Sequence, residues 1–217
     1  MRISGLVVFV CVGIAFAQND IHPWRGRYEQ VLMARPSRGV AFERVYQSYA
    51  DHEGIDAWLK ALNANSEDVS SALIAGYIHE RLGHDEAALK AYASAALRAP
   101  DQFSAHAAQG RLLWHLRRYD LAAASLKLAI ERKPPPAQLR EYQKMLGRVY
   151  AAADEGDRAV AAWLKLAELF PDDSVTLEEL ADLLLEEDRP DEALKQYQRL
   201  RQVSDDHYMK VRAAMSI

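Results

Sequence analysis

The sequence has one cysteine, Cys11, and one long apolar run, and both lie within its first seventeen residues. A chain of 217 residues with a single thiol lacks the disulfide framework of small secreted domains. Its formal net charge is −4 and its pI is near 6.0. Because nucleic-acid-binding domains carry a clustered basic footprint, we do not expect this chain to bind nucleic acid.

Sequence patterns of common catalytic and metal sites are also missing. The chain has no Walker A loop, no G-x-G-x-x-G and no G-x-S-x-G elbow. Its seven histidines include no pair with the spacing of an H-E-x-x-H zinc helix. We therefore expect no cofactor, no metal site and no enzymatic activity.

Residues 1–17, MRISGLVVFVCVGIAFA, have the organisation of a secretory signal peptide. Arg2 supplies a positive charge, an apolar run of 11 residues follows, and Ala15-Phe16-Ala17 is an A-x-A cleavage signal. The run is too short for a bilayer core of about 30 Å, which needs roughly 20 apolar residues. We predict cleavage before Gln18 and export across the inner membrane of a bacterium, to a periplasmic or extracellular location. The alternative is an uncleaved anchor.

The remainder of the chain is dominated by a recurring pair of amphipathic helices, with no sign of alternating strands. In the first copy Gly83 separates the two helical halves and Pro100 ends the unit. The second copy follows after 34 residues, the third after a further 37, and the fourth after 34 again. The equivalent small and turn-forming positions are Gly76, Ala88, Ala95 and Pro100; Gly110, Ala122, Ala129 and Pro134; Gly147, Ala159 and Pro171; and Ala181 and Ala193. The three extra residues fall near the prolines at 134–136, where we expect a longer loop.

This pattern resembles the tetratricopeptide repeat, a 34-residue helix-turn-helix unit. Residues 146–150, LGRVY, match the first part of the motif, and Ala159, Trp163 and Pro171 complete that copy. The opening Trp of the motif is missing from every copy, and Leu126 replaces the aromatic residue of the second. The resemblance covers about residues 69–217 and implies an all-α fold, a right-handed α-solenoid of helical hairpins.

Close helix packing explains the small residues. We expect Gly76, Gly110 and Gly147 to let the two helices of a repeat approach each other, while large residues such as Tyr92 and Trp163 fill the space between repeats. One repeat cannot bury its apolar face alone, so roughly three or more must stack.

These observations divide the chain into three parts. Residues 1–17 are the signal peptide, residues 18–68 form an N-terminal helical segment with a degenerate capping hairpin over 40–62, and residues 69–217 hold about four repeats. The first helix of a fifth repeat is expected over 205–217. That helix either ends the array, with its outer face exposed to solvent, or begins further repeats in a longer protein.

The resemblance also implies that the first helices of successive repeats line a concave groove that takes a peptide or a partner helix. Carried onto this chain, the groove positions are Leu73, Tyr77, Glu80 and Arg81; Ala107, Arg111, Trp114 and His115; Glu141, Lys144 and Arg148; and Glu178, Asp182 and Glu186. Six of them form a predicted basic and aromatic stripe for the partner: Tyr77, Arg81, Arg111, Trp114, Lys144 and Arg148.

Arginine and aromatic residues are common in binding hot spots, and such a stripe suits an acidic segment or a chain-terminal carboxylate. The alternative is a solvated face whose charges are neutralised by neighbouring carboxylates. The carboxylate-clamp pattern of the family is not reproduced residue by residue, so we do not predict binding of chaperone tails.

Three functions are compatible with the sequence. The main hypothesis is a non-catalytic protein-interaction scaffold of the cell envelope. The chain is alternatively the accessory repeat region of a larger exported enzyme, or a structural protein that self-associates.

Overall fold

The computed structural model describes residues 23–65 and 67–204, and these residues form eleven α-helices and no strand. The helices are α1 (Arg25–Ala34), α2 (Val40–Asp51), α3 (Ile55–Ala64), α4 (Val69–Arg81), α5 (Asp85–Arg98), α6 (Phe103–His115), α7 (Tyr119–Glu131), α8 (Pro136–Ala152), α9 (Gly156–Leu169), α10 (Ser174–Glu186) and α11 (Pro190–Val203). The predicted signal peptide and the predicted helix over 205–217 lie outside the described residues.

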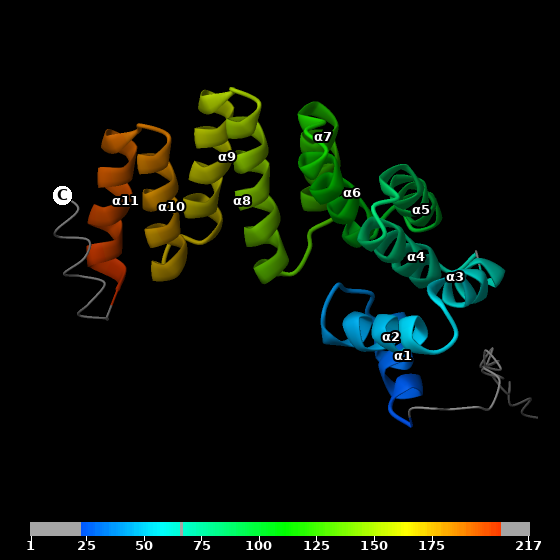
Figure 1. Ribbon diagram of the computed structural model, residues 1–217. Coiled ribbons are helices and arrows are strands. Elements are labelled where there is room, and N and C mark those ends of the chain that lie inside the picture. Colours follow the sequence, from blue (N-terminus) through cyan, green and yellow to red (C-terminus); the bar gives the residue numbers. More distant parts are fainter. Residues whose placement is uncertain (1–22, 66, 205–217) are drawn as a thin grey trace, which may run out of the picture.

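The eight helices from α4 to α11 form four hairpins that stack in chain order along a curved array (Figure 1). Helix α4 pairs with α5, α6 with α7, α8 with α9, and α10 with α11, and these four pairs make the most extensive helix–helix contacts of the chain. We call them the first to fourth repeats. The arrangement confirms the predicted all-α solenoid.

Each hairpin turns at the same position of the repeat. Gly83 has a positive φ of 74°, and the equivalent residues Arg117, Asp154 and Asp188 have φ values of 57°, 61° and 55°. In all four turns the next residue donates its backbone N–H to the carbonyl five positions earlier, at 2.9 Å. This bond satisfies a carbonyl that the end of the helix leaves free. Glycine was predicted as the turn residue only in the first repeat, but the backbone conformation is shared by all four.

The small residues in the core of the hairpins lie where the repeat pattern predicts, but Tyr92 and Trp163, predicted to fill the space between repeats, pack against the glycine of their own hairpin. Ala88, Ala122, Ala159 and Ala193 are all fully buried on the second helices. Opposite them, Gly76 lies against Tyr92 and Gly147 lies against the indole of Trp163, so the second-helix side chains occupy the space that a Cβ atom would need. The glycines therefore permit the close helix contact, as expected.

The insertion before the third repeat lengthens a helix instead of a loop. Helix α8 has 17 residues, whereas α4, α6 and α10 have 13, and α8 begins at Pro136. Proline is favoured in the first turn of a helix, because its φ is preset and its missing N–H would be unbonded there. The three extra residues thus extend α8 by about one turn at its N-terminal end.

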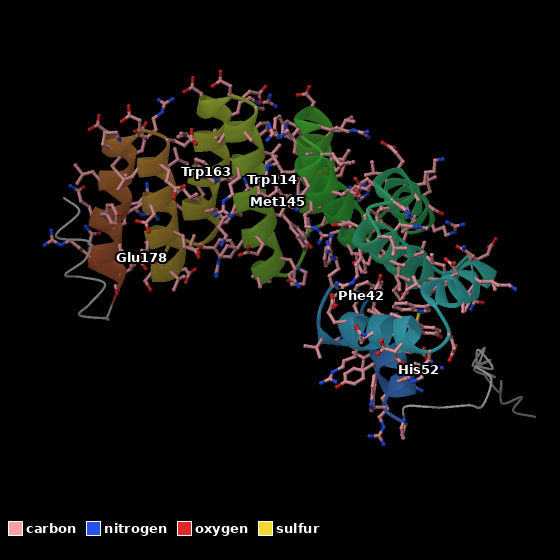
Figure 2. All side chains as sticks on the ribbon, in the orientation of Figure 1. Phe42, His52, Trp114, Met145, Trp163 and Glu178 are labelled. Carbon is pink, nitrogen blue, oxygen red and sulfur yellow. The ribbon has the colours of Figure 1, made fainter. Side chains whose placement is uncertain are left out.

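An aromatic cluster around Phe42, which Figure 2 labels, joins the N-terminal helices to the first repeat. The ring of Phe42, on α2, is 5.9 Å from the rings of Trp58 on α3 and Tyr77 on α4, and its side chain is 1% exposed. Tyr49 stacks on Trp58 with ring centroids 5.2 Å apart. The predicted hairpin paired the helices over 40–51 and 55–62, whereas in the structure α2 makes its more extensive contact with α1.

Two half-buried histidines make the stability of the array depend on pH. Burial, followed by the neighbouring His84, lowers the pKa of His79. Burial, followed by Arg132, also lowers the pKa of His106, against a smaller opposite effect of the Pro100 backbone. The unfolded chain, with histidine pKa values of about 6.5, therefore binds more protons than the folded chain in mildly acidic solution.

Above a pH of about 6.5 these histidines are neutral and the folded chain has its full stability. As the pH falls through their lowered folded-state pKa values, this part of the stability is lost, because protons bind more readily to the unfolded chain. We expect a His79→Gln/His106→Gln variant to lose less stability than the wild type between pH 7.5 and pH 5. Urea unfolding at the two pH values measures this difference. Equal losses for both proteins would contradict the expectation.

Candidate functional site

A cleft of about 860 Å³ lies between the loop that joins α1 to α2 and the first helices of the second and third repeats. In Figure 1 this loop faces the N-terminal end of α8. The lining residues are Arg35, Pro36, Ser37 and Arg38 from the loop; Tyr77 from α4; Gln102, Phe103, Ser104, Ala107, Ala108 and Arg111 at and within α6; and Pro135, Gln138, Tyr142 and Met145 at and within α8. Segments distant in the sequence thus share one site.

The lining combines positive charge with aromatic surface. It includes three arginines and no carboxylate. The rings of Phe103 and Tyr142 lie 6.1 Å apart in a tilted arrangement, and both side chains are half-buried. The small residues Ala107 and Ala108 also line the cleft. Such a surface favours a ligand that carries both negative charge and an apolar group.

One carboxylate behind the cleft holds two of its arginines. Glu80 accepts a hydrogen bond from Nη2 of Arg111 at 3.0 Å, a second from Nη1 of Arg38, and a third from the hydroxyl of Tyr92 at 2.7 Å. Its side chain is 9% exposed. Burial, then the negative charge of Glu80, raises the pKa of Tyr92, so this hydroxyl stays protonated and donates to the carboxylate. Glu80 therefore fixes both Arg111 and the loop.

Tyr77 forms part of the wall next to the loop. It is 5% exposed, and its hydroxyl donates to the carbonyl oxygen of Pro36 over 3.5 Å. Burial raises the pKa of Tyr77 to about 12, although the guanidinium of Arg111 partly offsets the effect. Burial likewise raises the pKa of Tyr142, again against the influence of Arg111. Both phenols are neutral at physiological pH and present a hydroxyl and an apolar ring.

The N-terminal ends of α6 and α8 also meet the cleft. Neither helix has an acidic residue in its first turn, and neither has a side chain that caps its N-terminus by a hydrogen bond. The first N–H groups of a helix have no intrahelical partner and carry a partial positive charge. Both ends add to the positive character that the arginines give the cleft.

The structure brings together only two members of the predicted stripe, Tyr77 and Arg111, in this cleft. Arg81 instead faces α2, where it pairs with Glu43 at 3.0 Å and lies over the ring of Tyr46 at 4.5 Å. Trp114 is half-buried and packs, like Met145, against the core shared by the later repeats (Figure 2). The binding role of these residues stays a prediction.

The two remaining stripe residues, both on α8, differ in whether they form ion pairs. Lys144 lies 2.8 Å from Glu141 and 3.0 Å from Glu179 of the next repeat. Burial opposes the charge of Lys144, but the hydrogen bonds to these two carboxylates outweigh it and raise its pKa. Arg148 is exposed and forms no ion pair with any residue of the described ranges. Neutralisation by neighbouring carboxylates, the alternative drawn from the sequence, thus holds for Lys144 and Arg81, and in part for Arg111, which shares Glu80 with Arg38.

Sequence reasoning missed the loop over residues 35–38 and the aromatic pair of Phe103 and Tyr142. The loop lies outside the repeats, so no periodic pattern marks it. Phe103 precedes the predicted groove positions of α6, and the extra turn of α8 moves Gln138 to the cleft. Within residues 23–65 and 67–204, no group of three metal-ligating side chains is present, and no helix has the length and hydropathy needed to cross a membrane.

The stacked hairpins and their shared turn geometry define an α-solenoid protein, and the first helices of three repeats contribute to its cleft. The sequence matches the tetratricopeptide repeat over residues 75–136 and 144–207, together more than half of the chain. The chain therefore belongs to the tetratricopeptide repeat family. Membership of this family implies a protein-interaction scaffold, and proteins of the family are generally non-catalytic.

Several solved structures share this fold. MamA is 19% identical with a TM-score of 0.57, and the match covers 78% of this chain and 94% of MamA. The pilF protein of Pseudomonas aeruginosa is 16% identical with a TM-score of 0.58, over 88% of this chain and 85% of that one. YrrB, described as a repeat protein with an unusual peptide-binding site, is 14% identical with a TM-score of 0.50, over 87% and 97%. No curated protein matches the sequence.

Proposed function

We propose that the protein is a non-catalytic interaction scaffold of the bacterial cell envelope, which binds a peptide or helix of a partner protein in the cleft between the α1–α2 loop and helices α6 and α8. The observation that carries this proposal is the cleft itself, with its arginines, its aromatic pair and its lack of carboxylates. The signal-peptide pattern of residues 1–17 supports the location in the envelope. The partner contributes an acidic segment.

The dimensions of the cleft fit a segment of polypeptide. Its volume of about 860 Å³ is within the range of ligand pockets, and its walls come from the loop and three different helices. An extended peptide or one face of a helix would contact several of these walls at once. Such contacts allow a groove to recognise side chains that recur at a fixed spacing. The fixed position of Arg111, held by Glu80, gives such a ligand a charged contact that is already ordered before binding.

Site-specific cross-linking tests whether the partner occupies this cleft. We expect a photoreactive phenylalanine analogue in place of Phe103 to cross-link a protein from envelope extract, because Phe103 lines the cleft. The same analogue in place of Leu97, which is 84% exposed on α5, should not cross-link that protein. Mass spectrometry identifies the adduct. Equal cross-linking from the two positions would show that contact is unspecific and that the cleft is not the binding site.

A charge variant gives the same experiment a second readout. Ser104→Glu/Gln138→Glu places two carboxylates in the cleft, each in the first turn of a helix, where a negative charge is favourable and the fold should be kept. We expect this variant of the full chain, with the analogue at position 103, to lose most of its cross-linked product. Gln30→Glu/Gln198→Glu, at exposed positions on α1 and α11 outside the cleft, adds the same two charges and should retain it.

A further inference from the structure

The loop over residues 35–38 belongs to the cleft although it lies outside the repeats. The match to the repeat family begins at residue 75, yet the loop forms one entire wall of the cleft. Two contacts attach it to α4: the carbonyl of Pro36 accepts a hydrogen bond from Tyr77, and Arg38 pairs with Glu80. The loop is therefore held against the first repeat in a defined position, facing the N-terminal end of α8 (Figure 1).

The charges of the loop are not balanced by their surroundings. Arg38 and Arg111 share the single carboxylate of Glu80, which leaves one net positive charge in that group. Arg35 is exposed and makes no ion pair within the described ranges, so it adds a second. The buried Nε atom of Arg111 has no hydrogen-bond partner among the same residues. That atom is too buried for a ligand to reach, but the excess of guanidinium groups favours a ligand that brings carboxylates.

The apolar part of the cleft lies on the repeats. Phe103 and Tyr142 place their rings side by side, and Met145 continues the same surface along α8. All three side chains are half-buried, so each already has a fixed contact with the protein and still has a free face. Aromatic and Met side chains in such positions are typical anchors for an apolar group of a partner.

We propose that the α1–α2 loop completes the binding site, and that the ligand is an acidic segment of a partner protein with one large apolar or aromatic side chain. Its carboxylates pair with Arg35 and Arg38 of the loop and with Arg111 of the second repeat. Its apolar side chain contacts the surface formed by Phe103, Tyr142 and Met145. This inference rests on the proposed function and adds to it the apolar side chain that the acidic segment carries, the arginines that pair with its carboxylates and the need for the loop in binding.

Synthetic peptides test the inference directly. The first probe is a fluorescein-labelled ten-residue peptide of alternating Asp and Glu with one central Phe; in a second the Phe is Ala, and in a third every acidic residue is Lys. Fluorescence anisotropy with the full chain measures affinity at low and at physiological salt. We expect the first peptide to bind tightest, the second to bind at least about tenfold more weakly, and the third not to bind.

Variants of the chain then separate the loop from general charge. Arg35→Glu should weaken binding of the first peptide at least about tenfold, because it replaces an attraction by a repulsion at the loop. Arg27→Glu is the matched control: Arg27 is exposed on α1, lies outside the cleft, and undergoes the same change of charge. It should stay within about twofold of the wild type. Arg35→Ala, with an intermediate loss, checks that the effect of Arg35→Glu does not come from misfolding.

The outcomes separate this inference from the proposed function. Equal weakening by Arg35→Glu and Arg27→Glu would overturn the role of the loop. Tight binding of the basic peptide, or failure of the acidic peptide to bind while position 103 still cross-links a partner, would overturn the class of ligand and leave the groove function intact. Cross-linking of a second copy of this chain at position 103 would overturn both the acidic-segment ligand and the partner protein.

Discussion

Gly147→Leu is expected to lower the free energy of unfolding by roughly 3 kcal/mol, the upper end of the usual cost of overpacking. A Cβ atom at position 147 would lie 2.0 Å from Nε1 of Trp163. The indole has no room to move away, because it is 2% exposed and donates a hydrogen bond to the carbonyl of Lys144 at 3.1 Å. The hairpin of the third repeat must therefore open, and α8 carries Tyr142 and Met145 of the cleft with it.

Chemical denaturation monitored by circular dichroism measures this loss. Gly26→Ala is the matched control, since Gly26 is also in a helix but has no atom within 4 Å of an added Cβ. Alanine is the better helix former by about 1 kcal/mol, so this control should be neutral or stabilising. A stable Gly147→Leu protein would show that the two helices do not pack as described.

The sequence predicted the solenoid because its signals are periodic and local. The glycine positions and buried alanines recur at a fixed spacing, and each identifies a contact inside a single hairpin. The turns show that residue type alone does not predict where a hairpin turns. Arg117 and Asp154 adopt the same left-handed conformation as Gly83, since the hydrogen bond that ends the helix imposes it on whichever residue stands there. The spacing of the repeats therefore predicts the position of these turns better than the type of residue found there.

The candidate site was predicted only in part, because its charges depend on partners from other repeats. Lys144 looks like a free cation in its own helix, but Glu179 reaches it from the fourth repeat. Glu80 was placed in the groove, and its actual role is to hold Arg38 and Arg111 from behind. Such pairings join residues 31 to 42 positions apart through side-chain geometry, which a repeat pattern does not encode.

The largest single loss is expected from Phe42→Ala, at about 3–5 kcal/mol for a fully buried aromatic side chain. Phe42 touches the rings of Tyr46, Trp58 and Tyr77, so its removal leaves a cavity between three helices. Repeat arrays are stabilised mainly by contacts between neighbours, and a defect at one end stays largely at that end. We expect faster amide hydrogen exchange in α1 to α4 and little change in α8 to α11.

The same variant connects the stability of the N-terminal helices to binding. Phe42→Ala alters no charge and no residue of the cleft lining, yet it weakens the attachment of the segment that carries Arg35 and Arg38. If the α1–α2 loop is a wall of the site, the affinity for the acidic peptide must fall together with the protection of α2. Val40→Ala, at a position of the same helix that is 69% exposed, should change neither. Full affinity in a Phe42→Ala protein whose α1 and α2 exchange freely would mean that the repeats alone bind the ligand.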